Sequence, residues 1–336
     1  MNFKKMFLPA ALLLSLAVLM SSCAKTEMPE EVSETQDEES ADETGAVSGS
    51  AAEENETSID VKFIPRSKED FFNDVTLPAV SEAVAAKEES IPDRPETITI
   101  KGVEISTDVT SLTLNSKELT NEDIADLRYL FDLTDLQIFE NNITDLTPIK
   151  GLTHLKSLSV YKNNITDLKP IAGLTELQTL YLRDNGITDI SPLKDLVNIV
   201  SLDLSQNDIS DISVLSNMPQ ISILKLNDNN IEDISPLSGM TSMDRIHIQN
   251  NNISDIQPLW QMLETTEIYA ENNNISDISV VSEMKDLGWL KLSNNPIADL
   301  SPVYDLTELR KLWITNVNAA GRDGLAEALP DCVITY

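Results

Sequence analysis

Aspartate recurs every 22 residues along much of the chain, from Asp145 to Asp299. A column of stacked carboxylates could bind cations, because carboxylate oxygens are the usual ligands of hard metal ions. The same column could instead order loops, since aspartate readily accepts hydrogen bonds from nearby backbone N–H groups. We adopt the second interpretation, in which the aspartates order loops, because it is the simpler one and needs no ligand. The sequence therefore predicts no metal site and no cofactor.

Histidine and cysteine, which carry much of enzyme chemistry, are scarce. The chain has two of each. It contains no GxGxxG motif, no P-loop, and no Cys or His cluster with the spacing of metal ligands. We predict no catalytic residue and no enzymatic activity.

Asparagine recurs with the same 22-residue period, each time two residues before an isoleucine. The series is Asn141, Asn163, Asn185, Asn207, Asn229, Asn251, Asn273 and Asn295. In a representative unit, Leu180 and Leu182 alternate with Tyr181, which predicts a short strand with one buried face. Eight such units would stack their strands in parallel, and each asparagine would satisfy backbone groups in its own turn and the adjacent one.

A helix-start signal follows each aspartate. Ser191 and Pro192 predict a serine N-cap followed by a proline at the first helical position. Few residues remain before the next strand, so each return segment should be a short 3₁₀ or single α turn.

The period and pattern of residues 133–316 resemble the internalin-type leucine-rich repeat of bacterial surface proteins. The resemblance implies an α/β solenoid with a parallel sheet on its concave face and short 3₁₀ or helical turns on its convex face. We expect eight 22-residue units plus a final strand in that region. Internalins attach through their C-terminal regions, but no sortase motif follows these repeats, so attachment is expected at the other end.

The segments that flank the repeats should close the open core. Residues 96–132 are predicted to form an N-terminal cap that begins with a hairpin turning at Lys101-Gly102. Leu112 should lie in a first repeat strand, 24 residues before Leu136. Residues 317–336 should form the C-terminal cap, with a helix over 322–329 and a strand over 332–336, and the Cys332 thiol there should be buried and inert.

Residues 1–22 have the features of an export signal, with two lysines before a short apolar run. Ser21-Ser22-Cys23 resembles a bacterial lipoprotein cleavage box, which makes Cys23 the expected lipidation site; ordinary secretion is the alternative. Residues 23–60 should form a disordered acidic tether, because residues 24–60 carry thirteen acidic side chains against one lysine. Residues 61–95 are expected to be a partly ordered linker.

The net charge of −32 argues against nucleic acid as a partner and against binding to anionic membranes through charge. The membrane should be contacted only through the N-terminal lipid. We expect a monomer, outside the cytoplasm and anchored at the bacterial cell surface.

The repeat period identifies the strand side chains that point away from the core. Their ionised side chains are nearly balanced, with five basic and four acidic, and aromatic residues collect at both ends. Exposed aromatics beside cations are typical of binding hot spots. The predicted main patch is Arg245, His247, Tyr269, Trp289, Lys291 and Trp313. The predicted secondary patch is Phe139, Tyr161, Tyr181 and Arg183.

These observations favour a non-catalytic binding protein whose ligand is a protein or peptide. Two alternatives remain open at this point. Tryptophan and tyrosine also stack on sugar rings, so the ligand could be a carbohydrate or a cell-wall fragment. The repeats could also be a structural spacer without a specific ligand, because aromatics suit strands in any case.

Overall fold

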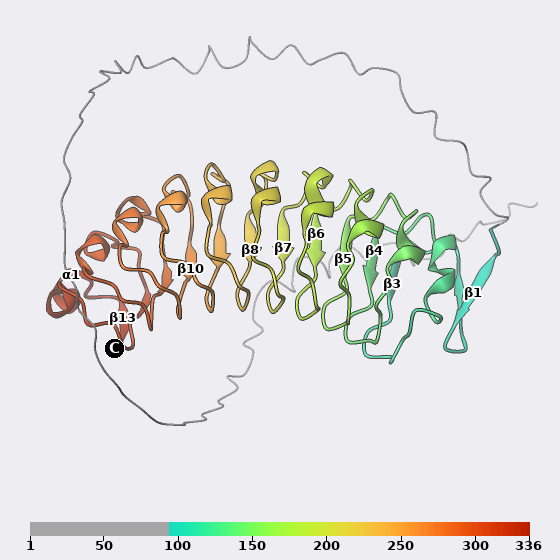
Figure 1. Ribbon diagram of the computed structural model, residues 1–336, viewed down its shortest axis with the longest axis horizontal. Helices are drawn as coiled ribbons and strands as arrows, with labels where there is room; N and C mark the ends of the chain where they lie inside the picture. The colour runs from blue at the N-terminus through green and yellow to red at the C-terminus, as the bar shows by residue number, and fades with distance from the viewer. Residues whose placement is uncertain (1–93) are drawn as a thin grey trace, which may run out of the picture. The chain divides into compact units, whose positions relative to one another are not determined.

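The computed structural model describes residues 94–336 of the chain (Figure 1). The predicted signal peptide, the lipidation site Cys23, the acidic tether and residues 61–93 of the predicted linker lie outside the described residues.

Eleven short strands form one parallel sheet in which each strand lies beside its neighbour in the sequence. Leu158 pairs with Leu180, and Leu180 with Leu202, so the register advances by the predicted period. The strands are β3 (Ser111–Thr113), β4 (Asp135–Gln137), β5 (Ser157–Ser159), β6 (Thr179–Tyr181), β7 (Ser201–Asp203), β8 (Ile223–Lys225), β9 (Arg245–His247), β10 (Glu267–Tyr269), β11 (Trp289–Lys291), β12 (Lys311–Trp313) and β13 (Val333–Thr335). The predicted α/β leucine-rich repeat solenoid is confirmed.

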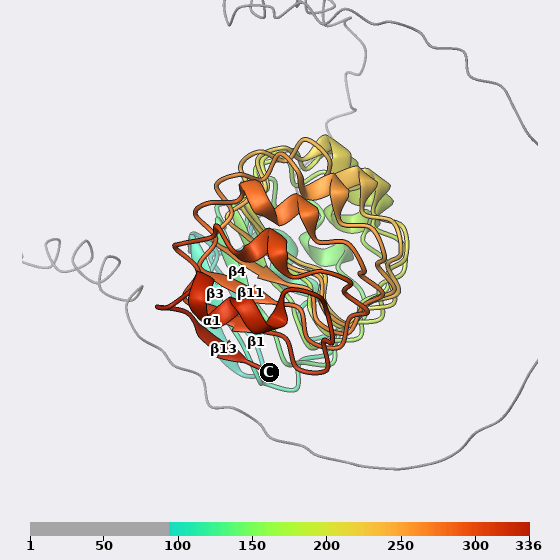
Figure 2. The same cartoon turned by 90° about the vertical axis from the view of Figure 1, so that its left-hand side faces the viewer.

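Short 3₁₀ helices connect the strands on the other side of each coil, and Figure 2 shows the coils lying one behind another. The chain leaves too few residues per return for a longer helix, as expected from the period. These helices are η1 (Ala125–Tyr129), η2 (Thr147–Ile149), η3 (Lys169–Ile171), η4 (Ser191–Asp195), η5 (Ser213–Asn217), η6 (Ser235–Leu237), η7 (Gln257–Leu259), η8 (Ser279–Glu283), η9 (Ser301–Val303) and η10 (Arg322–Gly324).

The core is a continuous column of leucine and isoleucine that runs through all the repeats. The middle residue of each strand from β4 to β12 points inward, and Leu180, Leu202 and Leu224 are fully buried. Each coil buries its apolar side chains against the coils before and after it, so stability comes from stacking neighbours.

Caps close both ends of this column. β1 (Thr97–Ile100) and β2 (Val103–Ser106) form the predicted antiparallel hairpin, and Lys101 and Gly102 both have positive φ at its turn. β3 pairs with β4 so that Leu112 lies opposite Leu136, with the predicted offset of 24 residues. At the other end, η10 and α1 (Leu325–Ala328) precede β13.

One prediction for the C-terminal cap is wrong. Cys332 is only partly buried, at the edge of the core, because β13 is the last strand and no further coil covers it. Burial still raises the pKa of its thiol, which disfavours the reactive thiolate.

The asparagine column stabilises the turn after each strand, as predicted. Asn229 is buried; its Oδ1 accepts the backbone N–H of Ile209 in the preceding coil (3.0 Å), and its Nδ2 donates to the carbonyls of Leu204 and Leu226 (both 3.0 Å). Equivalent bonds recur along the column. The role of these amides is structural, because their hydrogen-bonding groups face the backbone.

A second asparagine ladder, which sequence reasoning missed, lies on the surface beside the first. Each residue just before a column asparagine has positive φ, between 52° and 58° from Glu140 to Asn294. Asparagine tolerates this conformation better than most residues. Asn294 Nδ2 donates to Asn272 Oδ1, Asn272 Nδ2 to Asn250 Oδ1, and Asn250 Nδ2 to Asp228 Oδ1, each at 2.6 Å.

The predicted serine N-caps are wrong. Ile190 occupies the N-cap of η4, Ser191 is the first helical residue, and the cap makes no side-chain hydrogen bond. Asp189 replaces the serine in this function, because its Oδ1 accepts the backbone N–H of Ser191 (2.8 Å). All eight aspartates of the column accept the N–H two residues on, which confirms the loop-ordering interpretation.

These turns should make stability depend on pH. Hydrogen bonds from the serine two residues on hold the pKa of Asp189, Asp211, Asp233 and Asp299 below the ordinary value of 3.8. The unfolded chain therefore binds protons first, and the stabilisation is lost as the pH falls below 3.8 through the lowered values. We expect the thermal midpoint, followed by circular dichroism, to drop less steeply in acid when all four are replaced by asparagine.

The control for that experiment replaces four exposed aspartates that lack a serine two residues on, namely Asp184, Asp195, Asp286 and Asp331. An equal flattening of the acid transition in this control would show that net charge, and not the turn hydrogen bonds, governs the effect.

Candidate functional site

The candidate site is the outer face of the parallel sheet, which we call the sheet face. In each strand from β4 to β12 the first and third side chains flank a buried middle residue; Trp289 and Lys291, for example, flank Leu290. Neighbouring strands lie about 4.8 Å apart, so side chains at equivalent positions can contact one another.

Four residues of the predicted main patch form one contiguous cluster across strands β9 to β12, which we call the aromatic cluster. The ring of His247 stacks on that of Tyr269, with centroids 4.3 Å apart and an angle of 8°. The Lys291 amino group lies 4.1 Å from the Tyr269 ring centroid and 5.1 Å from that of Trp313. Trp313 meets Tyr269 edge-on at 6.5 Å. Each member is therefore held in place by the next.

Glu267 holds His247, the member of the aromatic cluster that lies on β9. Its Oε1 lies 2.5 Å from Nε2 of His247, and both side chains are more than four-fifths buried. Burial alone would raise the pKa of Glu267, but the hydrogen bond and charge of His247, together with Arg245, bring it below its ordinary value. The carboxylate is therefore ionised at neutral pH.

Burial and the nearby carboxylate of Glu267 raise the pKa of Tyr269 to about 12. Its phenol therefore stays neutral and keeps its O–H donor. Burial also raises the pKa of Glu271, although the Lys291 amino group, 3.6 Å from Oε1, opposes the shift. Glu271 Oε2 and Gln249 Oε1 are buried without a hydrogen-bond partner in the described part of the chain. The surface beside the aromatic cluster thus has two oxygen atoms that are free to accept hydrogen bonds.

The other two residues of the predicted main patch lie apart from the aromatic cluster. Arg245 Nε lies 3.3 Å from a carboxylate oxygen of Asp244. Trp289 faces Arg310, whose guanidinium carbon lies 5.9 Å from the indole ring centroid. Both belong to the first position of their strands, whereas the aromatic cluster uses the third position.

The predicted secondary patch is split in the same way. Phe139 and Tyr161 stack with centroids 4.2 Å apart and an angle of 12°. Arg183 turns away from them and donates from Nε to Oε1 of Gln206 (2.7 Å). Tyr181 leans toward β7, where its hydroxyl accepts a long hydrogen bond from Ser201 Oγ (3.4 Å).

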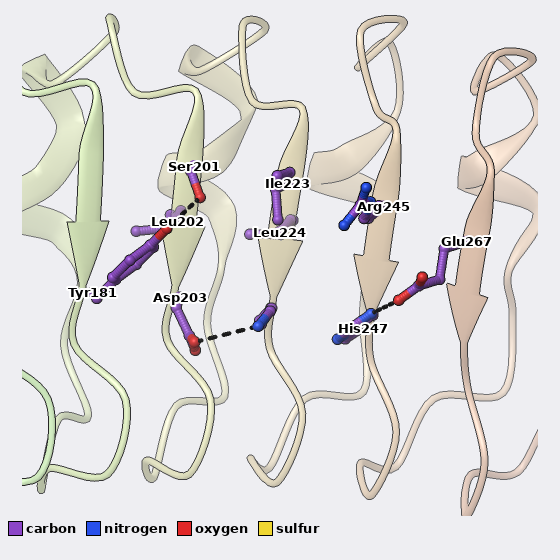
Figure 3. Close-up of a pocket in the computed structure, with 10 residues that line it drawn as sticks. Tyr181, Ser201, Leu202, Asp203, Ile223, Leu224, Arg245, His247 and Glu267 are labelled. Carbon is purple, nitrogen blue, oxygen red and sulfur yellow. Dashed lines mark hydrogen bonds and ion pairs between the residues drawn. The ribbon is translucent and has the colours of Figure 1, made fainter. Parts of the chain in front are cut away.

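A hollow of about 280 Å³ lies on the sheet face between the two patches, across strands β6 to β10 (Figure 3). Ile223 is central to it, with Tyr181 and Ser201 on one side and His247 and Glu267 on the other. Further lining residues are Leu202, Asp203, Leu224, Lys225 and Arg245. The hollow combines an apolar floor with polar walls, which is the usual composition of a binding pocket.

Ion pairs neutralise much of the charge on the sheet face. The Lys225 amino group lies 3.9 Å from a carboxylate oxygen of Asp203 on the neighbouring strand. Lys291 pairs with Glu271 in the same direction along the sheet. The repeat period places the strand residues on the face, but no sequence signal indicates these pairings or the hollow at Ile223.

No helix among the described residues is long and apolar enough to cross a membrane. Residues 94–336 also contain no group of three or more His, Cys, Asp or Glu side chains arranged to hold a metal ion.

The stacked coils and their asparagine turns define a leucine-rich repeat protein. Residues 175–217 and 219–259 match the family model described as leucine-rich repeats in two copies. No curated protein matches the sequence.

Solved structures of bacterial leucine-rich repeat proteins are similar to this chain. An internalin, InlF of Listeria monocytogenes, is 26% identical with a TM-score of 0.50, and the match covers 70% of this chain and 83% of that one. A leucine-rich repeat protein of Leptospira interrogans is 23% identical with a TM-score of 0.60, covering 63% and 56%. The chain thus shares the leucine-rich repeat fold with these bacterial proteins, and its repeats are similar to those of the internalin.

A plant peptide hormone receptor, RGFR1, shares the fold. It was solved in complex with RGF2 and is 19% identical with a TM-score of 0.56. The match covers 63% of this chain and 37% of the receptor chain.

Proposed function

We propose that this chain is a lipid-anchored protein of the bacterial cell surface that binds a protein or peptide segment on its sheet face, without catalysis. The observation that carries the proposal is the aromatic cluster, which lies next to the hollow at Ile223. Rigid aromatic side chains beside cations and a concave apolar floor are features of binding hot spots. A peptide hormone receptor with the same fold has been solved in complex with RGF2.

A peptide fits the aromatic cluster better than a sugar. Stacking on a sugar needs a free ring face, but Tyr269 has His247 against it from β9 and the Lys291 amino group over it from β11. Tyr161 likewise has one face against Phe139. The rim of the rings and the indole of Trp313 remain available, and these suit contact with the side chains and backbone carbonyls of a peptide.

The size of the surface indicates the length of the bound segment. From Ile223 in β8 to Trp313 in β12 there are four strand spacings, or about 19 Å. An extended chain rises about 3.3 Å per residue, so about six residues would span the distance. One apolar side chain could enter the hollow while the following residues lie along the aromatic cluster.

The proposal can be tested by selecting a displayed library of random peptides on the full chain. We expect enriched sequences whose binding is lost in the variant Lys291→Ala/Trp313→Ala and retained in the variant Phe139→Ala/Tyr161→Ala. Binding of glycans that Trp313→Ala abolishes would favour carbohydrate recognition instead. The absence of any enriched peptide, on a face that tolerates every substitution, would favour a structural spacer.

Lipid anchoring rests on the export signal and on Ser21-Ser22-Cys23. We expect Cys23→Ala to leave the protein uncleaved or to release it from the detergent phase into the medium, because acyl chains on one cysteine are the proposed anchor. Cys332→Ala, which changes the chain's other cysteine, is the matched control and should remain anchored. An intact mass that starts at another residue, without an acyl group, would contradict this assignment.

A further inference from the structure

The return side of the solenoid carries an apolar groove at a single repeat. Trp260 and Leu263, after η7, are 56% and 50% exposed and line a hollow of about 410 Å³. Thr241, Gln261 and Glu283 complete its lining. The groove lies outside the strands of the sheet, so it is separate from the aromatic cluster.

The repeat period shows how unusual these two residues are. The position of Trp260 is occupied by Ser238 in the preceding repeat and by Ser282 in the following one. The position of Leu263 is occupied by Thr241 in the preceding repeat and by Lys285 in the following one. The neighbouring coils therefore complete their turns with polar side chains at these two positions. Packing does not require the tryptophan and leucine, which expose surface that stays in contact with water.

The backbone below the groove is held in place. The Trp260 N–H donates to the carbonyl of Gln257 (3.1 Å), and the Met262 N–H donates to that of Leu259 (2.9 Å). Met262, between the two exposed residues, is buried in the core. The two apolar side chains are thus presented outward from a fixed turn, which limits the entropy lost on binding.

The charge around the groove determines which partner fits. The lining includes Glu283, and Glu264 adjoins Leu263 in the sequence; within residues 94–336 neither carboxylate forms an ion pair. The nearby Lys285 amino group donates to the carbonyl of Ser282. A second copy of this chain, whose net charge is −32, and an anionic membrane would both be repelled.

We propose that this groove is a second docking site, for a protein segment that carries an apolar side chain next to lysine or arginine. The apolar side chain packs between Trp260 and Leu263, and the cation pairs with Glu283. The site would act independently of ligand binding on the sheet face, since the two lie on different sides of the coils.

The experiment uses the full chain labelled with 5-fluorotryptophan, which gives one fluorine resonance for each of the three tryptophans. The resonance missing from Trp260→Ser identifies Trp260. Three blocked peptides of equal length are added: leucine between lysines, leucine between glutamates, and alanine between lysines. We expect the first peptide alone to shift the Trp260 resonance and to leave those of Trp289 and Trp313 unchanged.

Two variants test the assigned contacts. Trp260→Ser/Leu263→Thr installs residues found at these positions in neighbouring coils, so the fold should be kept while binding of the first peptide, followed by calorimetry, is lost. Glu283→Gln should weaken binding about two- to fivefold, the effect of one exposed ion pair. Equal shifts with all three peptides, shifts at Trp289 or Trp313 only, or no shift at all would overturn the proposal. A Trp260 shift that depends on protein concentration without peptide would show self-association and would also overturn it.

Discussion

Asn229→Ala is expected to lower the free energy of unfolding by about 1–3 kcal/mol, because buried backbone groups would lose their partners. The Ile209 N–H and the carbonyls of Leu204 and Leu226 all bond to this one amide. Water cannot replace it, since Asn229 is buried between coils. Denaturant unfolding followed by circular dichroism measures the loss.

The adjacent Asn230→Ala is the matched control. Asn230 is exposed, and equivalent positions in other repeats hold Gly186 and Asp208, so its side chain has no fixed structural role. We expect its removal to change stability by less than about 0.5 kcal/mol. Equal losses in the two variants would contradict the structural function of the column. A stable Asn229→Ala protein that no longer binds its ligand would show that this asparagine is a contact residue.

Most of the fold could be predicted because a 22-residue period determines register as well as secondary structure. Leu158, Leu180 and Leu202 lie opposite one another because only that alignment buries every inward leucine. The serine caps were wrong for a local reason. Aspartate two residues earlier already accepts the N–H of Ser191, so the chain enters the helix one residue before the predicted start.

The candidate site could be predicted only in part. The period shows which side chains point outward, but not which way each long side chain turns. Lys291 lies over Tyr269 and Trp313, whereas Arg183 turns to Gln206 and leaves its predicted partners. Lys225 and Asp203, which pair across neighbouring strands, both line the hollow at Ile223, and the period does not indicate that pairing.

The two tryptophans of the predicted main patch should therefore differ in their contribution to binding. Trp313 contacts Tyr269 and Lys291 within the aromatic cluster, whereas Trp289 faces Arg310 outside it. We expect Trp313→Ala to weaken binding of a peptide selected on this face by about 30-fold, equivalent to about 2 kcal/mol. Trp289→Ala should weaken it less than threefold. Titration calorimetry with one selected peptide measures both.

The fold should survive Trp313→Ala, because the side chain is partly exposed and the buried residue of that strand is Leu312. An unchanged melting temperature distinguishes loss of contact from loss of structure. Trp313 is one of the two rings that the Lys291 amino group contacts, so we expect Lys291→Ala to weaken peptide binding by a similar amount. Because the two side chains act together, the double variant should lose less affinity than the sum of the two single losses. Additive losses would show that Trp313 and Lys291 act independently and not as one cluster. A loss confined to Phe139 and Tyr161 would place recognition elsewhere on the sheet face.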